Sequence, residues 1–327
     1  MQRSLNTFPI SSGIRSKLTS NGYNIAEDLK NVDPVELTKE IGITLEEAST
    51  ILDLIAPQTD NKSISLLDLL KDENHSRQII TFSQKLDEML GGGIPLSKIT
   101  EIAGPPGIGK TQFCLQLSVD VQIPREFAGL GEQVVYIDTE GTFTFERLKD
   151  IANATIHHCH SISRSLSAVN NFTVSSILEN IHYFRCIDHI QLIATINLLP
   201  DHIKANPKIR LIIIDNIALP FRIQFEGKVN ARTRILSELG QTLTQLATEY
   251  KLAVVITNQM STNFESEGRS SLIPALGETW GHTCTLRLIL SWQGNQRFAT
   301  LNKSPFKQES TVQFQIIVNG KKIIYKM

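Results

Sequence analysis

The chain has 327 residues, of which 41% are hydrophobic and 20% are charged, a balance that is ordinary for a folded protein and too apolar for a disordered one. Its length exceeds the roughly 100–200 residues of one typical domain, so we expect one large core with a smaller appendage. The formal net charge of -1 excludes a uniformly basic coat that would bind nucleic acid over the whole surface.

The charge is unevenly distributed along the chain. Residues 1–56 carry five Lys and Arg against eight Asp and Glu, whereas residues 278–327 carry seven against two. The C-terminal segment is therefore locally basic and suited to phosphate. The four cysteines are widely spaced, which indicates neither a zinc site nor a disulfide framework and fits a reducing compartment. With no run of about 18 apolar residues and no signal-peptide layout, we expect a soluble protein that is not secreted and does not bind a membrane.

Residues 4–56 predict a bundle of four or five short helices. Stretches such as "DPVELTKEIG" and "TLEEASTILDLI" open with a capping Asp or Thr and space their apolar residues by three or four. Residues 57–78, rich in Ser, Asn, Asp and Lys, predict a linker with one apolar anchor, "SLLDLL". We therefore expect a helical domain over residues 1–56 and a larger domain over residues 79–327.

From residue 79 onward, apolar strands alternate with helical stretches. The expected strands are "KITEIAG", "QVVYIDTE", "IHYFRC", "IRLIIIDN" and "LAVVITN". This alternation predicts an α/β fold in which a mainly parallel sheet is covered by helices on both faces. After Thr283 the stretches "CTLRLILSW", "QRFATLNKS" and "TVQFQIIV" predict three strands that extend the sheet in antiparallel fashion.

The stretch GPPGIGKT has the spacing of a P-loop, a glycine-rich turn that binds nucleotide phosphates. It follows a predicted strand and precedes a predicted helix, so its backbone N–H groups can converge on an anion. Lys110 would reach the β and γ phosphates of ATP, and Thr111 would bind Mg2+. The alternative is an ordinary strand-to-helix turn. The residues of the loop are Gly104, Pro105, Pro106, Gly107, Ile108, Gly109, Lys110 and Thr111.

Carboxylates at the ends of two expected strands complete a hydrolytic site. Asp215 ends "LIIID", where open α/β sheets hold their ligands, and is the natural second anchor for Mg2+. Glu140 in "VVYIDTEGTF" is the candidate that orients water for attack on the γ-phosphate. Asp138 is equally close to the strand end, and either carboxylate could instead cap the following turn.

Five motifs together resemble the RecA-like homologous recombinases in order and approximate spacing. They are "GGGIPLSKITEIAGPPGIGKTQ", "YIDTEGTF", "LIIID", "VITNQM" and "GHTCTLRL". The resemblance covers nearly the whole chain, and "VDVQIP", "PALGE" and "KSP" are most similar to the C-type group of eukaryotic recombinase paralogues. It implies a RecA-type P-loop ATPase core with antiparallel C-terminal strands and a small all-α, helix-hairpin-helix-like N-terminal domain.

The same resemblance implies roles for further residues. Gln112 follows the P-loop as in the family, and Arg147 matches an arginine that packs near the adenine base. Gln259 matches the polar residue between the γ-phosphate and the DNA-binding loops, and we group it with Glu140 and Lys110 as catalytic. His282 matches a histidine that communicates with nucleotide. Alternatively, Gln259 satisfies a strand end and His282 is a core histidine.

Two segments match the DNA-facing loops of the family by position, residues 222–232 and 261–281. In the first, Arg222, Lys228 and Arg232 are candidates to hold backbone phosphates. In the second, Arg269 is outnumbered by glutamates. A few arginines in a loop are otherwise more typical of solvated surface.

The chain departs from the strand-exchange recombinases at three places. Pro105 and Pro106 replace the usual glutamate and its neighbour, and Lys303 replaces an aspartate that lies at the subunit junction in the family. Lys303 is either an interface residue, together with His282, or a solvated surface lysine. Residues 57–78 contain no phenylalanine, so the Phe-x-x-Ala element with which recombinases pack onto an identical subunit is missing.

These departures favour an accessory ATPase over a strand exchanger. We expect a slow, DNA-stimulated ATPase in the nucleus that uses ATP and Mg2+ and assembles with other recombinase paralogues. Further expected partners are single-stranded or branched DNA and the recombinase filament. The turn at Gly42 in the N-terminal domain would bind DNA phosphate or a partner protein. The alternatives are a self-polymerising recombinase and a scaffold in which nucleotide merely locks the fold.

Overall fold

The computed structural model describes residues 4–5, 8–29, 32–55, 65–67, 78–162, 171–225, 229–264 and 270–316. Contacts between Cα atoms divide the chain into two compact units, Met1–Glu73 and Asn74–Met327. The expected linker, residues 57–78, contains this division, and most of it lies outside the described residues, so its bounds stay a prediction. Across the described ranges, no helix combines the length and hydrophobicity needed to span a membrane.

The N-terminal unit is a small helical bundle around its own core. Its elements are α1 (Ser12–Ser20), the 3-10 helix η2 (Ala26–Leu29), α2 (Pro34–Ile41) and α3 (Leu45–Ile55). Their apolar residues meet in a cluster that includes Leu5, Leu18, Leu29, Leu37 and Ile51, all almost fully buried. The spacing by three or four residues therefore places one face of each helix inside.

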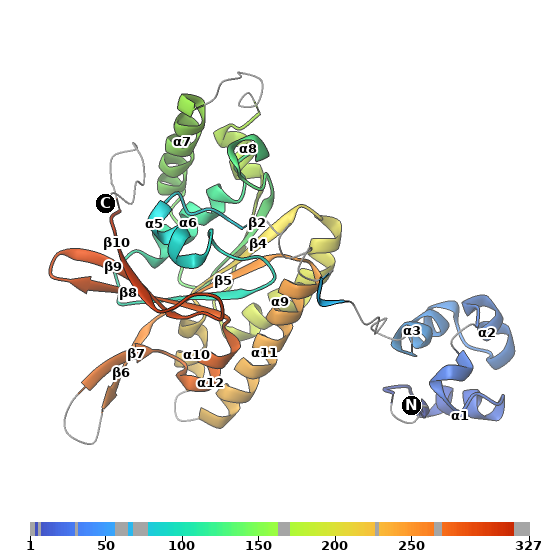
Figure 1. Ribbon diagram of the computed structural model, residues 1–327. Helices are drawn as coiled ribbons and strands as arrows, with labels where there is room; N and C mark the ends of the chain where they lie inside the picture. Colours follow the sequence, from blue (N-terminus) through green and yellow to red (C-terminus); the bar gives the residue numbers. More distant parts are fainter. Residues whose placement is uncertain are drawn as a thin grey trace. The chain divides into compact units, whose positions relative to one another are not determined.

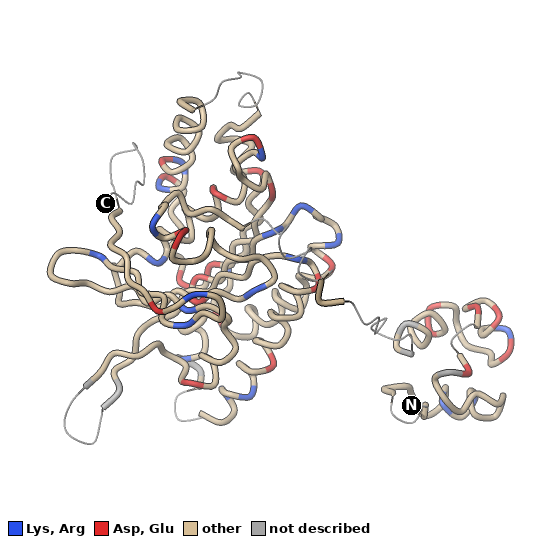
Figure 2. Tube along the Cα trace, in the orientation of Figure 1, with Lys and Arg blue, Asp and Glu red and all other residues tan. Residues whose placement is uncertain are grey.

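The turn between α2 and α3 satisfies its polar groups within the chain. Gly42 ends α2 with a φ of 62°, in the left-handed region, and its carbonyl accepts a hydrogen bond from Lys17 Nζ at 2.8 Å. The Thr44 amide donates to the Glu47 carboxylate at 2.9 Å. A carboxylate already occupies this helix N-terminus, and Figure 2 shows acidic residues along α2 and α3. Both features disfavour phosphate at this turn.

The second unit contains an eight-stranded sheet in the order β10-β9-β8-β1-β5-β4-β2-β3. The six strands from β8 to β3 are parallel, and β9 and β10 are antiparallel. The prediction of a mainly parallel sheet with antiparallel C-terminal strands is confirmed, except that β8 itself lies parallel to β1. The strands are β1 (Ile99–Ala103), β2 (Gln133–Asp138), β3 (Ile181–Arg185), β4 (Ile209–Asp215), β5 (Ala253–Asn258), β8 (Leu286–Gln293), β9 (Gln296–Lys303) and β10 (Ser310–Phe314).

Helices cover both faces of this sheet, as Figure 1 shows. Alternate residues of each strand enter two separate cores: Val134 and Tyr136 face one, and Val135 and Ile137 face the other. The first core is covered by α5 (Gln84–Leu90), α6 (Lys110–Asp120), α7 (Phe145–Ile162) and α8 (Val174–Glu179). The second is covered by α9 (His189–Ala205), α10 (Ala218–Gln224), α11 (Val229–Glu249) and α12 (Gly277–Thr283).

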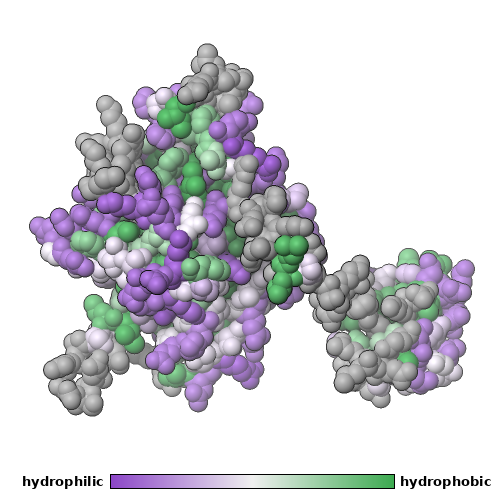
Figure 3. All heavy atoms as spheres, in the orientation of Figure 1, coloured by the Kyte–Doolittle hydropathy of each residue, from purple (hydrophilic) through white to green (hydrophobic). Residues whose placement is uncertain are grey.

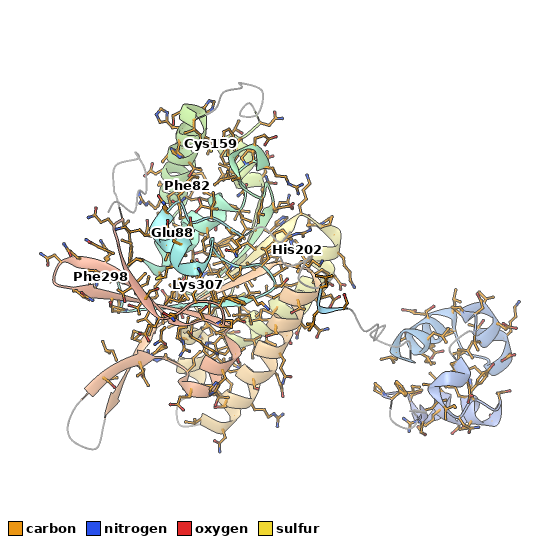
Figure 4. All side chains as sticks on the ribbon, in the orientation of Figure 1. Phe82, Glu88, Cys159, His202, Phe298 and Lys307 are labelled. Atoms are coloured by element: carbon orange, nitrogen blue, oxygen red, sulfur yellow. The ribbon has the colours of Figure 1, made fainter. Side chains whose placement is uncertain are left out.

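The sequence pattern did not predict two short elements, a helix and a hairpin, because tertiary contacts determine their structure. Helix α5 is only seven residues long and packs beside the β9–β10 connection, where Lys307 lies next to Glu88 (Figure 4). A second sheet is the hairpin of β6 (Met260–Phe264) and β7 (Ser270–Pro274). Leu272 and Ile273 of this hairpin are exposed, and a hydrophobic spot is visible there in Figure 3.

Candidate nucleotide-binding site

The predicted P-loop connects β1 to α6 in the second unit. Gly107 and Gly109 have φ values of 73° and 114°, in the region that glycine adopts without strain. Gly109 is also the residue before the first turn of α6, and a Cβ there would lie 2.2 Å from Ile316 Cδ1. The loop therefore curls around the N-terminus of α6, which is suited to binding an anion.

A cavity of about 330 Å³ opens at the loop and brings together most of the expected site residues. It is lined by Pro106, Gly107, Gly109, Lys110, Thr111, Gln112, Glu140, Thr142, Asp215 and Gln259. These residues come from the P-loop and from the carboxyl ends of β2, β4 and β5, the edge of a parallel sheet at which ligands bind.

Lys110 lies inside the loop. Its Nζ donates to the carbonyls of Gly104 at 2.8 Å and Pro105 at 3.1 Å. Burial lowers the pKa of Lys110, and the nearby carboxylates of Glu140 and Asp215 oppose that shift. A half-buried ammonium in a low-dielectric pocket interacts strongly with an anionic phosphate.

Asp215 is held rigidly at the end of β4. Its carboxylate is buried and accepts hydrogen bonds from Tyr136 Oη at 2.9 Å and from Thr257 Oγ1. Burial raises the pKa of Tyr136 well above its usual range, and the Asp215 charge adds to this effect. Thr111 lines the same cavity, so a hydroxyl and an oriented carboxylate are available there. This set of oxygen donors fits Mg2+.

The two carboxylates after β2 have different surroundings. Asp138 is buried and accepts from the Gly141 amide at 2.6 Å, from the Phe143 amide at 3.3 Å and from Tyr183 Oη at 3.0 Å. It therefore fixes the turn. Glu140 faces the cavity instead. Of the two candidates left open by the sequence, Glu140 is the one that lines the cavity, and its role in orienting water stays a prediction.

Glu140 is the centre of a hydrogen-bonded chain. Its Oε1 accepts from Gln259 Nε2 at 2.8 Å and from Asn216 Nδ2. Gln259 Oε1 in turn accepts from Arg222 Nη1 at 3.1 Å. The exposed Arg222 is thus two hydrogen bonds from Glu140, so the position of this guanidinium can influence the cavity carboxylate. No sequence motif indicated Asn216 as a site residue, although it directly follows Asp215 at the strand end.

The predicted adenine contact is connected to the loop. Arg147, in the first turn of α7, donates from Nε to Gln112 Oε1 at 2.6 Å. Gln112 also lines the cavity, so Arg147 is hydrogen-bonded to a residue of the cavity wall. The role of Arg147 at the base stays a prediction.

A second arginine supports the P-loop from the far side, and no motif pointed to it. Arg297 Nε donates to the carbonyl of Ile108 at 3.1 Å, and its guanidinium carbon lies 4.2 Å from the centre of the Trp292 ring. Arg297 is on β9 and contacts the loop only because β9 folds back along β8. This separation of 189 positions explains why sequence spacing did not reveal it.

The two expected DNA-facing segments are more structured than loops. In the first, α10 extends through Arg222 and α11 begins at Val229, so Arg222 and Arg232 are helical. Lys228 lies outside the described residues. In the second, β6 and β7 form a hairpin that is followed by α12. Arg269, near the hairpin tip, also lies outside the described residues. The expectation that these segments are loops is therefore wrong for most of their described residues, and DNA contact stays a prediction.

The remaining predicted residues, His282 and Lys303, lie close together. His282 is exposed on α12, so it is not a core histidine. Lys303 Nζ donates to the carbonyls of Cys284 at 2.6 Å, Gly281 at 2.9 Å and His282 at 3.2 Å. The ammonium is therefore engaged by the chain itself rather than freely solvated. The role of either residue at a subunit interface stays a prediction.

Comparison with known proteins identifies similar sequences. Residues 74–323, which include every residue of the cavity, match the Rad51 family. The chain is 46% identical to DNA repair protein RAD51 homolog 3 of Cricetulus griseus, over 98% of this chain and 92% of that protein. It is 40% identical to the protein of the same name from Dictyostelium discoideum, over 80% and 70%. It is 32% identical to DNA repair and recombination protein RadA of Metallosphaera sedula, over 95% and 92%.

Proposed function

Because the chain belongs to the Rad51 family, we propose that it is an ATPase subunit of a recombinase-paralogue complex that assists recombinase filaments on DNA in homologous-recombination repair. The names of its relatives support a role in DNA repair, and the residues of the cavity support ATP hydrolysis. The observation that carries the proposal is the chain of hydrogen bonds from Glu140 through Gln259 to Arg222. It joins the expected hydrolytic residue to the first segment that resembles a DNA-facing loop. We also infer a nuclear location, because homologous-recombination repair acts on nuclear DNA; a cytoplasmic pool is the alternative.

The chemistry at the cavity is phosphoryl transfer to water. The backbone amides of Gly107 to Thr111 and the Lys110 ammonium bind the β and γ phosphates and neutralise charge that develops during transfer. Thr111 and Asp215 would hold Mg2+, which would supply further neutralisation of the phosphate charge. Glu140 accepts a hydrogen bond from the attacking water and orients it in line with the γ-phosphate.

DNA enters this scheme through Arg222. A phosphate of the DNA backbone competes with Gln259 for the exposed guanidinium, because a charged acceptor forms the stronger hydrogen bond. Once Gln259 Oε1 is released, the side-chain amide of Gln259 can rotate. This rotation changes the hydrogen bond from Gln259 to Glu140. Binding of DNA therefore changes the position of the carboxylate that orients water, and slow basal turnover is stimulated by DNA.

The accessory role is supported by the missing Phe-x-x-Ala element in residues 57–78. Without it the chain lacks the segment that packs recombinases onto identical subunits. Purification of the protein from cells, followed by measurement of the mass of the intact complex, tests this role. We expect a defined assembly with other family members. Long helical self-assemblies on single-stranded DNA with ATP would instead indicate a strand-exchange recombinase.

A scaffold that binds nucleotide without turnover is distinguished by two substitutions. Lys110→Ala removes the phosphate contact, whereas Glu140→Gln keeps the cavity and removes only the charge that orients water. We expect both variants to fail in a cellular assay of recombination repair. Loss of repair with Lys110→Ala alone would show that binding without hydrolysis is sufficient.

A further inference from the structure

The peptide that joins Ile108 to Gly109 lies in the second half of the P-loop. Its carbonyl accepts a hydrogen bond from Arg297 Nε at 3.1 Å, and its N–H is the amide of Gly109. In a planar trans peptide the C=O and the N–H point in opposite directions. We infer that Arg297 is a positioning residue: by holding the Ile108 carbonyl, it directs the Gly109 amide to a nucleotide phosphate, which presupposes the phosphate binding proposed for this loop.

The two ends of this peptide meet different surroundings. Gly109 lines the cavity, whereas neither Ile108 nor Arg297 is among the described residues that line it. The side chain of Ile108 is fully buried in the core on the α6 side of the sheet. Arg297 therefore reaches the carbonyl from outside the cavity. The N–H of the same peptide points the other way, toward the space in which a phosphate would bind.

Glycine gives this peptide the freedom to rotate. Gly107 and Gly109 flank Ile108 and have φ values of 73° and 114°. Because glycine adopts positive and negative φ almost equally, the peptide after Ile108 can turn over at little steric cost. That rotation would present a carbonyl oxygen, with its partial negative charge, to the phosphate in place of an N–H. A hydrogen bond that fixes the carbonyl from outside opposes it.

Arg297 is well placed to fix the carbonyl. Trp292 and Arg297 are directly paired across β8 and β9, the neighbouring strands in Figure 1, and the guanidinium carbon lies 4.2 Å from the centre of the Trp292 ring. This cation–π contact holds the guanidinium in place. A charged donor also forms a stronger hydrogen bond than a neutral one. It polarises the peptide, which makes the N–H on the other side a better donor to phosphate.

The first half of the loop is held by a different cation. The carbonyls of Gly104 and Pro105 accept from Lys110 Nζ, which lies inside the loop and lines the cavity. Lys110 thus holds two carbonyls from within, and Arg297 holds a third from outside. Each of these hydrogen bonds engages an oxygen that would otherwise repel an anion. Only Lys110 would also touch the phosphate, so Arg297 acts through the peptide alone.

Substitutions of matched length isolate the donor of Arg297. Gln places its side-chain nitrogen as many bonds from the backbone as arginine Nε, and Met has the same length without a donor. Binding of a fluorescent ADP analogue with Mg2+ to the full-length protein, and its competition by pyrophosphate, give two dissociation constants. We expect Arg297→Met to raise both about tenfold, the value of one hydrogen bond to a charged group, and Arg297→Gln to stay within about threefold of the parent.

Pyrophosphate separates a defect at the phosphates from a defect at the base, because it has no base. Arg210→Met is the matched control, since Arg210 Nη1 donates to the carbonyls of Pro207 at 2.8 Å and Ile209 at 2.7 Å, at the end of β4 opposite Asp215. It should leave both constants unchanged. Circular dichroism checks folding, and Arg297→Leu serves the same comparison if Arg297→Met does not fold.

Three results would overturn the positioning role: affinities of Arg297→Met equal to those of the parent, a loss in Arg297→Gln as large as in Arg297→Met, or weaker binding of ADP with unchanged binding of pyrophosphate. Each of them leaves the proposed ATPase intact, because the parent still binds nucleotide and the measurement needs neither hydrolysis nor DNA. A parent protein that bound neither ADP nor pyrophosphate would overturn the proposed function together with the positioning role.

Discussion

At the scale of single residues, Asp138 and Glu140 belong to one turn but have different hydrogen-bond partners. Asp138 accepts hydrogen bonds from backbone amides and a tyrosine hydroxyl and lies 3.8 Å from Arg185 Nη1. Glu140, among the described residues, accepts from the side-chain amides of Asn216 and Gln259, which can move. The Asp138 carboxylate is held in place, because its donors are backbone amides and the hydroxyl of a packed tyrosine ring. The Glu140 carboxylate is adjustable, which would suit the role proposed for it, the orientation of the attacking water.

The first prediction concerns Glu140→Gln. The amide keeps the size of the side chain but cannot act as a base toward water, so ATP hydrolysis should fall about 100-fold or more. The nucleotide dissociation constant should change less than threefold, because the Lys110 and P-loop contacts remain. Phosphate release and binding of a fluorescent ATP analogue measure the two quantities. A variant that hydrolyses ATP at the parent rate would exclude Glu140 from this role.

The second prediction concerns Arg222→Ala. Removal of the guanidinium breaks the bond to Gln259, so the increase in hydrolysis caused by single-stranded DNA should be largely lost while nucleotide binding is retained. Arg234→Ala is the matched control, since Arg234 is exposed on α11 and pairs only with Glu238 among the ion pairs seen there. Equal DNA stimulation in both variants would contradict the proposed path from Arg222 to Glu140.

Sequence reasoning predicted the residues of the site that belong to local patterns and missed those defined by distant contacts. Lys110 and Asp215 follow from strand ends and glycine spacing, which are local properties. Asn216 and Arg297 act through bonds to Glu140 and Ile108, 76 and 189 positions away. No spacing rule encodes such pairs, because they depend on which strands become neighbours in the sheet.

At the scale of elements, strand β9 contacts both the P-loop and helix α12. Arg297 near the start of β9 holds the carbonyl of Ile108, and Lys303 at its end holds α12. The antiparallel strand β9 therefore supports the phosphate-binding turn and the helix after the hairpin simultaneously. Strand β9 therefore supports the site although none of its residues is among those that line the cavity.

The third prediction concerns the pH dependence of stability through α5. Burial raises the pKa of Asp87 from its ordinary value of 3.8 to about 6, although its Oδ1 accepts from the Thr81 amide and hydroxyl. A raised pKa means that the folded state binds the proton more tightly, so this contribution to stability is complete below about pH 4 and is lost as the pH rises through 6.

Asp87→Asn removes this titration, so the variant should gain stability relative to the parent between pH 4 and 7, by up to about 3 kcal/mol. Urea unfolding at several pH values measures the difference. Glu88→Gln, an exposed neighbour on the same helix, should show no such trend. A constant difference between Asp87→Asn and the parent at all pH values would contradict the shifted pKa.

The strands and long helices of the ATPase unit were predictable because each carries a strong apolar period. The β6–β7 hairpin was not, since its strands lack a regular alternation of apolar and polar residues and leave Leu272 and Ile273 exposed. Residues 222–232 likewise contain a glycine and polar residues that suggest a loop, yet α10 and α11 extend into them. Tertiary packing of Phe221 and Leu236 into the core overrides the local preference there.

At the scale of the whole molecule, the two units have separate hydrophobic cores and only the second contains the nucleotide cavity. Binding of a ligand stabilises only the unit that binds it, by about 2.7 kcal/mol at 100 times the dissociation constant. We therefore expect the stability of the N-terminal unit to stay the same when ATP is bound or released.

The fourth prediction follows from this separation. In hydrogen exchange followed by mass spectrometry, saturating ATP analogue and Mg2+ should slow exchange in β1, α6 and β4. Exchange in α1, α2 and α3 should stay the same. Comparable protection of the N-terminal helices would show that the two units are energetically coupled.

The central claim is that this chain hydrolyses ATP at the P-loop cavity under the control of DNA. The most direct measurement is the rate of phosphate release by the full-length protein at saturating ATP and Mg2+, with and without single-stranded DNA, beside the Glu140→Gln variant. We predict a low basal rate that rises several-fold with DNA, and no rise in the variant. A rate that is the same with and without DNA, or equal in the parent and in Glu140→Gln, would contradict the account.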